Sequence, residues 1–373
     1  MPTVIEGALE TVLSRRRWLL AATALACAPT ARTAQAGRAT RLVAAWQTPS
    51  EHHIGVIAVD GARWSVQRAL AVPTRAHGLM VEPGGSVLAT ARRPGDWLLR
   101  WHPASGQTQW HWIEDDRRFN GHAIASADGR TVWTTETDLE TAQGKLAVRD
   151  ARSLRKHGEW ATGGMDPHEL MVLPERVGDI PAGSLIVANG GVPTLPETGR
   201  SKRHLDRMDA SLVALDPRDG ALLGQWRLDD PSLSIRHLAW DPVSRQVGIA
   251  LQAEHPDAGA KQRAPVFAAW DGQRLRAALG QPAVQGYGGD ICARPGGGFV
   301  VSCPRVDALA EYRADAHWAR NVAHREAYAL AASAGHWWAS GAEGVWCAPE
   351  GQEARNGAAS VQFDNHWMAW PKA

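Results

Sequence analysis

Residues 77–91 read HGLMVEPGGSVLATA: a histidine, a short apolar run, a turn rich in proline and glycine, and a second apolar run. Apolar runs of this length, separated by a Gly/Pro turn, are typical of two paired β-strands. The pattern returns in residues 122–135 and 168–188, again with a histidine in front of the first run. A fourth copy covers residues 237–251, and a fifth, residues 290–302, begins with an aspartate.

The spacing of these copies predicts the architecture. They start at residues 77, 122, 168, 237 and 290, so the intervals are 45, 46, 69 and 53 residues, and the longest contains a polar insertion. Repeats of about 40–50 residues with four short strands each are typical of β-propeller blades. A β-sandwich, the alternative, would show turn signals every 8–12 residues or so without this longer period.

Three further segments complete the count of blades. Strands are expected in residues 40–72, a degenerate last unit begins near Tyr328, and the segment 360–370 can close the ring. The sequence therefore predicts an all-β fold: one seven-bladed β-propeller of the WD40/YVTN-like kind, covering residues 37–373 as a single domain.

Residues 1–36 predict an export signal that is excluded from the fold. The stretch SRRRWLL (residues 14–20) resembles a twin-arginine signal, and AQA (residues 34–36) offers a small-residue cleavage site. The apolar run between them is shorter than the roughly 20 residues that span a bilayer. We therefore expect twin-arginine export to the periplasm and no transmembrane segment after removal of the leader.

Composition limits the classes of partner. The 40 basic and 39 acidic residues give a net charge of +1. Binding of nucleic acid calls for clustered positive charge, so no nucleic-acid partner is expected. The three cysteines after the leader form no CxxC pair, which excludes a zinc knuckle or a thioredoxin-like motif. Cys292 and Cys303 fall on neighbouring expected strands, where a disulfide and two buried thiols both stay open.

The starts of the innermost strands are the candidate site. These strands surround the central channel, so residues far apart in sequence converge at one of its mouths. The starting positions hold His77, His122, His168, His237 and Asp290. Imidazoles and carboxylates are ligands for transition metals, so this pattern predicts a metal site, with iron or copper as the ion. The alternative is that the repeated histidine ties strands together and binds nothing.

Other polar side chains are expected around the same mouth, because the second strand of each blade returns to it. Arginines there could hold a small anionic ligand through charge-assisted hydrogen bonds. The predicted ligand-binding residues are Arg92, Arg93, Glu136, Asn189, Arg200, Lys202, Arg236 and Gln252. Among the remaining histidines, His111 and His366 are assigned to turns or outer strands and are expected to be exposed.

No catalytic or nucleotide-binding motif stands out. The sequence has no GxSxG, no HExxH and no Gly-rich phosphate loop before a helix. A binding protein is therefore favoured over an enzyme.

A series of short motifs carries a family resemblance. In chain order they are RRPG (92–95), FNGH (119–122), TTE (134–136), GEW (158–160), PHEL (167–170), ANGG (188–191), GRxK (199–202), MxxSL (208–212) and IRHL (235–238). Together they resemble the DUF1513 family of exported proteins over essentially all of the mature chain.

The resemblance implies a seven-bladed propeller in the periplasm. Family genes lie beside imelysin-like and dihaem-peroxidase-like genes in iron-acquisition clusters, which implies iron handling and an imelysin-like partner. No reaction is established for the family.

Three hypotheses remain open at this point. The first is a metal-binding accessory protein of iron uptake. The second is a metal-dependent oxidoreductase or lyase acting on an anionic substrate. The third is a protein-interaction scaffold in which the histidines are structural.

Overall fold

The computed structural model describes residues 39–60, 63–193, 204–333, 335–342, 344–348, 352–355 and 361–371, with the backbone alone for 352–355. The predicted leader, Arg200 and Lys202 lie outside these residues. Residues Ala39–Ala373 form one compact unit.

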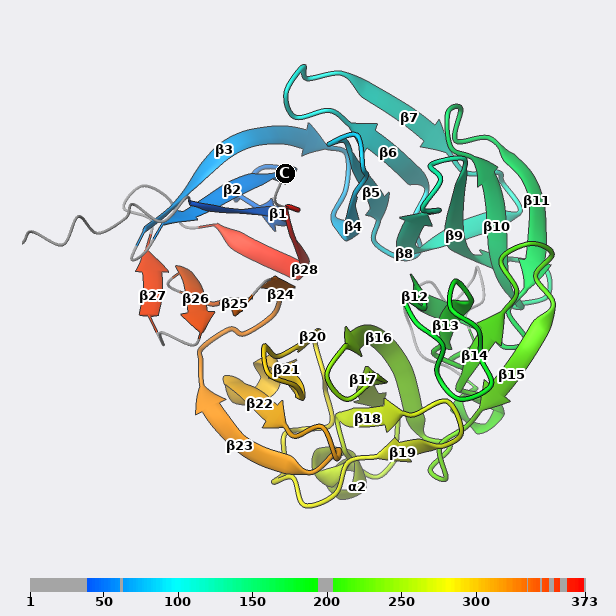
Figure 1. Cartoon of the computed structure of the whole chain (residues 1–373), viewed down its shortest axis with the longest axis vertical. Helices are drawn as coiled ribbons and strands as arrows, with labels where there is room; N and C mark the ends of the chain where they lie inside the picture. The colour runs from blue at the N-terminus through cyan, green and yellow to red at the C-terminus, as the bar shows by residue number, and fades with distance from the viewer. Residues whose placement is uncertain are drawn as a thin grey trace, which may run out of the picture. The chain divides into compact units, whose positions relative to one another are not determined.

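This unit is a seven-bladed β-propeller, as predicted (Figure 1). The strands of blades 1 to 3, from the axis outward, are β28 (Gln362–Ala369), β1 (Thr40–Gln47), β2 (His52–Asp60) and β3 (Arg63–Val72); β4 (Ala76–Val81), β5 (Val87–Ala91), β6 (Trp97–Trp101) and β7 (Thr108–Trp112); β8 (Arg117–Ala125), β9 (Thr131–Asp138), β10 (Gly144–Asp150) and β11 (Lys156–Ala161).

Blades 4 to 7 follow in the same order around the ring (Figure 1). Their strands are β12 (Pro167–Val172), β13 (Leu185–Asn189), β14 (Ser211–Leu215) and β15 (Leu222–Trp226); β16 (Leu233–Asp241), β17 (Gln246–Ala253), β18 (Phe267–Trp270) and β19 (Leu275–Ala277); β20 (Ile291–Ala293), β21 (Phe299–Cys303), β22 (Ala308–Tyr312) and β23 (Trp318–Ala323); β24 (Leu330–Ser333), β25 (His336–Ser340), β26 (Gly344–Ala348) and β27 (Gln352–Arg355). A short helix, α2 (Ala258–Arg263), lies in the connection between β17 and β18.

Blade 1 is built from both ends of the propeller domain. Its innermost strand, β28, comes from the C-terminal part of the chain and pairs antiparallel with β1. A single parallel bridge between Arg355 of β27 and Arg63 of β3 also joins blades 7 and 1. The closing strand expected within residues 360–370 is therefore confirmed.

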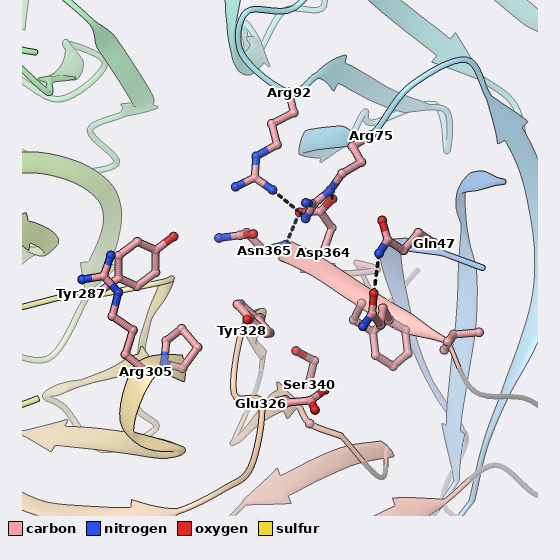
Figure 2. A pocket seen from close by; sticks show the side chains of 15 residues that line it. Gln47, Arg75, Arg92, Tyr287, Arg305, Glu326, Tyr328, Ser340, Asp364 and Asn365 are labelled. Carbon is pink, nitrogen blue, oxygen red and sulfur yellow. Dashed lines mark hydrogen bonds and ion pairs between the residues drawn. The ribbon is translucent and has the colours of Figure 1, made fainter. Parts of the chain in front are cut away.

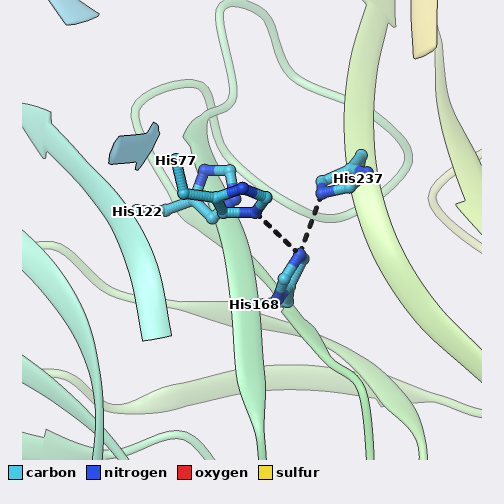
Figure 3. A group of neighbouring side chains, drawn as sticks. All are labelled: His77, His122, His168 and His237. Carbon is cyan, nitrogen blue, oxygen red and sulfur yellow. Dashed lines mark hydrogen bonds between the residues drawn. The ribbon is translucent and has the colours of Figure 1, made fainter. Parts of the chain in front are cut away.

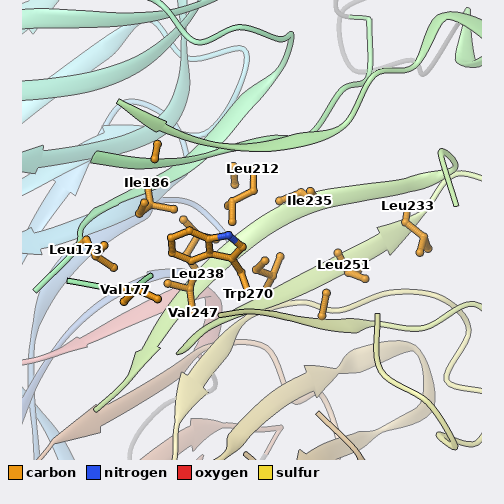
Figure 4. Close-up of a cluster of buried hydrophobic side chains, with 14 of the residues drawn as sticks. Leu173, Val177, Ile186, Leu212, Leu233, Ile235, Leu238, Val247, Leu251 and Trp270 are labelled. Atoms are coloured by element: carbon orange, nitrogen blue, oxygen red, sulfur yellow. The ribbon is translucent and has the colours of Figure 1, made fainter. Parts of the chain in front are cut away.

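Burial is highest in the middle strands of each blade and lowest in the outermost ones. The second and third strands are almost wholly buried, as in β5 and β6, because sheets cover both of their faces. The outermost strands, such as β23, are largely exposed. Figure 4 shows one cluster between blades 4 and 5, in which aliphatic side chains surround the fully buried Trp270. This packing fixes the blades as rigid walls around the axis.

Cys292 and Cys303 are separate, buried thiols. Cys292 pairs with Val300 across the β20–β21 ladder, so Cys303 is not opposite it. Burial raises the pKa of the Cys303 thiol to about 12. Among the described helices, none is long and apolar enough to cross a membrane.

Candidate metal centre

Five innermost strands lose their regular pairing where they carry a histidine. The interruptions lie between Ala76 and Leu79 in β4, Phe119 and Ala123 in β8, Pro167 and Leu170 in β12, Ile235 and His237 in β16, and Phe363 and Trp367 in β28. A β-bulge of this kind re-aims a side chain. In β8 and β16 the strand begins several residues earlier, so the bulge and not the strand start places the histidine.

The bulges direct five imidazoles to one point, which we call the axial histidine cluster: His77, His122, His168, His237 and His366. Ring centroids lie between 4.3 and 5.7 Å apart for nine of the ten pairs. All five side chains are buried. Figure 3 shows four of them, which each offer one nitrogen within 4.8 Å of the others.

Two glycines make room for this packing. A Cβ on Gly121 would lie 2.6 Å from His77 Cδ2, and one on Gly78 would lie 2.3 Å from the Gly121 carbonyl oxygen. Gly121 also has a φ of +106°, a conformation that other residues rarely adopt. The FNGH motif therefore includes a glycine because His77 packs against it.

The contacts between ring nitrogens cannot all be hydrogen bonds. His168 Nε2 lies 3.3 Å from His77 Nε2 and 2.8 Å from His237 Nε2, and His237 Nε2 lies 3.0 Å from His366 Nε2. An imidazole nitrogen carries either one proton or one lone pair, so it takes part in one hydrogen bond at a time. At most two of the three contacts can be satisfied, whatever tautomers are chosen. His122 Nε2 is also buried without a hydrogen-bond partner.

The same spacing suits a metal ion. Nitrogens bound to one ion at about 2.1 Å lie roughly 3 to 4 Å from one another. The three contacts of 2.8 to 3.3 Å lie at or just below the short end of that range, and the 4.8 Å limit on the four-histidine set lies slightly beyond its long end. Small rotations of the rings would place four lone pairs on a single cation.

Electrostatics keeps four of the histidines neutral. Burial is the largest cause that lowers the pKa of His77, His122, His168 and His237 well below 6.5. The charges of other cluster histidines lower these pKa values further, as do Arg92 for His77 and Arg236 for His168 and His237. Neutral imidazole is the form that binds metal.

His366 differs because a carboxylate holds it. Burial would lower the pKa of His366, but the charge and hydrogen bond of Asp290 raise it, with help from Glu169. Asp290 Oδ1 lies 3.1 Å from His366 Nδ1, so His366 Nε2 is left facing the cluster. Asp290 thereby orients a candidate ligand, in the way that carboxylates commonly orient metal-bound histidines.

Glu169 is a neighbour that sequence reasoning did not single out. Its Oε2 accepts a 2.8 Å hydrogen bond from the Leu238 backbone N–H. Burial raises the pKa of Glu169 to about 7, and the charge of Asp290 also raises it, against the opposing effect of His366.

The structure brings together His77, His122, His168 and His237, as the sequence predicted, and adds His366. The expectation that His366 is exposed in a turn or outer strand is wrong: it lies buried in β28, the innermost strand of blade 1. A signal was available in the sequence. Residues 119–122 read FNGH and residues 363–366 read FDNH, and both carry the same bulge.

Two of the predicted arginines share one carboxylate beside the cluster. Arg93 Nη1 lies 2.6 Å from Asp166 Oδ1, and Arg236 Nη1 lies 2.7 Å from Asp166 Oδ2. Asp166 has a positive φ of 54°. Arg92 lies at the same mouth of the central channel as the cluster, where its Nη1 is 3.7 Å from Asp364 Oδ1.

Three more of the predicted ligand-binding residues that the structure describes, Glu136, Asn189 and Gln252, are bound to partners within the protein. Glu136 is bound inside blade 3, with Oε1 2.6 Å from Arg149 Nη2. Asn189 donates to the Thr162 carbonyl oxygen at 2.8 Å, and Gln252 donates to the Gly288 carbonyl oxygen at 3.3 Å.

A cavity of about 560 Å³ opens at the same mouth (Figure 2). Arg75, Arg92 and Arg305 line it, with Tyr287 and Tyr328. Its wall includes Asp364 and Asn365, the two residues before His366, so the cavity reaches the edge of the cluster. Its size is in the range of small-molecule sites, about 300–1,000 Å³.

Comparison with solved structures shows shared architecture at low identity. Virginiamycin B lyase from Staphylococcus aureus matches with a TM-score of 0.54 at 11% identity, over 78% of this chain and 91% of that one. Hydrazine synthase from Kuenenia stuttgartiensis matches with a TM-score of 0.58 at 13% identity, over 83% and 93%. A functionally unknown protein from Desulfotomaculum acetoxidans DSM 771 matches with a TM-score of 0.58 at 8% identity, over 90% and 100%. These likenesses concern the fold alone.

No curated protein matches the chain significantly in sequence. A family model described as a protein of unknown function, DUF1513, matches residues 70–370, a span that contains every histidine of the axial cluster. The chain belongs to the DUF1513 family.

Proposed function

We propose that this protein binds a transition-metal ion on the propeller axis through the axial histidine cluster. One observation carries the proposal: His168 Nε2 and His237 Nε2 each face two further ring nitrogens at 2.8 to 3.3 Å. Hydrogen bonding cannot satisfy this arrangement, whereas one cation accepting several lone pairs can. The lowered pKa values of four histidines support it, because they leave those lone pairs available at neutral pH.

We further propose that the ion is iron and that the protein is an accessory binding protein of periplasmic iron acquisition. The twin-arginine-like stretch in residues 14–20 supports export. The resemblance to a family encoded beside imelysin-like genes supports the pathway, with an imelysin-like protein as partner. Copper also accepts imidazole ligands and is the competing ion.

A second candidate is a metal-dependent oxidoreductase or lyase that acts on an anionic substrate. The observation in its favour is the cavity at the edge of the cluster, with Arg75 and Arg92 in its wall. Turnover of an added anion by the metal-loaded protein would distinguish this candidate from a binding protein.

Metal analysis of the full chain, purified after native export, tests the proposal. We expect about one tightly held iron per chain in the wild type, and less than about a tenth of that in His168→Ala and His237→Ala. His157→Ala is the matched control, because His157 is an exposed residue on the outer strand β11. Thermal unfolding of each variant without metal checks that it is folded.

Each result that contradicts the proposal points to a different conclusion. A wild type without metal, or folded variants that keep full metal content, would overturn the metal site and favour structural histidines. Stoichiometric copper or zinc in place of iron would overturn the iron assignment alone. Capture of an imelysin-like protein that survives both histidine substitutions would favour the scaffold hypothesis.

A further inference from the structure

Arg236 is a buried cation, and one edge of its guanidinium group has no hydrogen-bond partner. Its side chain is fully buried, and Nη1 donates to Asp166 Oδ2 at 2.7 Å. Its other two nitrogens, Nε and Nη2, are buried without a hydrogen-bond partner. Burying charged donors without partners is costly, so a site that keeps them is a candidate for a ligand.

The surroundings of Arg236 carry excess positive charge. Arg93 binds the other oxygen of the same carboxylate, at 2.6 Å, so two guanidinium groups share Asp166. The charge of Glu254 also acts on Arg93, but Lys261 Nζ lies 3.9 Å from Glu254, so three cations face two carboxylates. A metal ion in the axial cluster would add to the excess.

The edge that stays unused in Arg236 binds carboxylates elsewhere in this chain. Arg75 donates to both oxygens of Asp364 through Nε and Nη2, each at 2.8 Å. Arg320 holds Glu311 in the same way, at 3.0 and 2.9 Å. The two parallel N–H groups of this edge match the two oxygens of a carboxylate. A carboxylate is therefore the ligand group that best fits the unpartnered edge of Arg236.

Arg236 also adjoins the metal ligands. It precedes His237 within the bulge of β16, and its charge lowers the pKa of both His168 and His237. Asp166 lies two residues before His168. Arg92 lines the 560 Å³ cavity (Figure 2). The next residue, Arg93, binds the same carboxylate as Arg236, so this pair of arginines links the cavity wall to Arg236.

We infer that the axial metal carries a small carboxylate anion as an additional ligand, with one carboxylate held by the Nε–Nη2 edge of Arg236. The inference rests on the proposed metal site and names its ligand class: a small di- or tricarboxylate that enters through the arginine-lined cavity. The ligand would neutralise the excess charge around Asp166 and fill the coordination positions that the histidines leave.

Calorimetric titration of the metal-loaded full chain with citrate, and separately with inorganic phosphate, tests this. We expect citrate to bind more tightly than phosphate. Arg236→Lys keeps the charge but removes the two-donor edge, so it should weaken citrate at least about tenfold while metal content stays that of the wild type. Arg320→Lys is the matched control, because it removes the same kind of edge on an outer strand, and it should leave the affinity unchanged.

Arg92→Gln, in the cavity wall, gives a second measurement if Arg236→Lys does not fold, and it should also weaken citrate. Wild-type protein that holds no metal would overturn the proposed function itself. A metal-loaded wild type that binds neither anion, or folded Arg236→Lys and Arg92→Gln variants with unchanged citrate affinity, would overturn this inference alone. Tighter binding of phosphate than of citrate would overturn the carboxylate assignment.

Discussion

Blade 3 and the propeller axis each bury an arginine completely, but they surround it differently. In blade 3, Arg149 uses all three of its nitrogens: Nε donates to Thr134, Nη1 contacts the Leu154 carbonyl oxygen and His111, and Nη2 binds Glu136. At the axis, Arg236 uses Nη1 alone. Burial is the same, and only the number of partners differs.

The difference separates two uses of buried polar groups. A network in which each donor has an acceptor stabilises a fold and has no place for another molecule. A group of converging nitrogens with too few partners has such a place. The convergence of several unpartnered nitrogens on one point, and not burial or charge alone, therefore makes the axis the candidate ligand site. Four predictions test this contrast.

The largest effect is expected from Arg149→Met. It leaves Glu136 buried without its closest cation, so the free energy of unfolding should fall by about 3–5 kcal/mol. Arg236→Met should cost clearly less, because Asp166 keeps Arg93. Urea unfolding of the metal-free proteins measures both. Metal content should stay normal in Arg149→Met, and equal losses of stability in the two variants would remove the contrast.

The stability of the metal-free protein should depend on pH. Four cluster histidines have a lowered pKa in the folded state, so the unfolded chain binds more protons and stability falls as the pH drops below about 6.5. The raised pKa values of His366 and Glu169 act in the opposite sense. With four groups against two, the loss between pH 6.5 and 5.5 should be on the order of 1–3 kcal/mol.

Urea unfolding at several pH values tests this. A His77→Gln, His122→Gln double variant should show a shallower pH dependence than the wild type, and the exposed control His157→Ala should match the wild type. A wild-type stability that stays flat or rises on acidification would contradict the assignment of neutral buried imidazoles.

Asp290→Asn should weaken metal binding by about 10–100-fold, because the charge that orients His366 is lost. Asp241→Asn is the control. Asp241 is equally buried, but it accepts backbone N–H groups of Val243 and Gly298, away from the cluster. Competition with a chelator measures the affinity. Equal affinities for the two variants would show that Asp290 is structural.

The smallest effect should come from Gly121→Ala. Its positive φ costs about 1–2 kcal/mol with any Cβ, and the 2.6 Å approach to His77 should also lower metal affinity. Gly129→Ala has the same kind of backbone, with φ +67°, but open space around it. Gly129→Ala should therefore lower the free energy of unfolding and leave the metal affinity unchanged. Unchanged metal affinity in Gly121→Ala would show that this glycine has no part in shaping the metal site.

The propeller could be predicted because its repeat recurs along the chain at intervals of 45 to 53 residues, apart from one unit lengthened by an insertion. The four histidines of residues 77 to 237 could be predicted for the same reason, since equivalent positions in a ring converge. The bulges could not, because they depend on how each inner strand pairs with its neighbour. They explain why a histidine six residues into β8 reaches the same point as one two residues into β4.

Glu136 and His366 show the limits of this reasoning. Glu136 lies in the second strand of its blade, as expected, but successive side chains in a strand alternate between faces. Glu136 shares the face of Thr134 and so binds Arg149 within blade 3. The repeat does not mark His366, because its blade is assembled from two distant segments of the sequence. The charge environment of Arg236 depends on Asp166, which no periodicity marks.

Closure of blade 1 by β28 also determines when the five-histidine cluster is complete. The strand that closes the ring, β28, also brings His366 to Asp290 and His237. His366 is therefore synthesised long after His77. A growing chain can fold several blades before it holds the complete set of imidazoles. Because the other four imidazoles come from blades 2 to 5, a partly made or clipped chain without β28 would hold the ion more weakly than the closed ring.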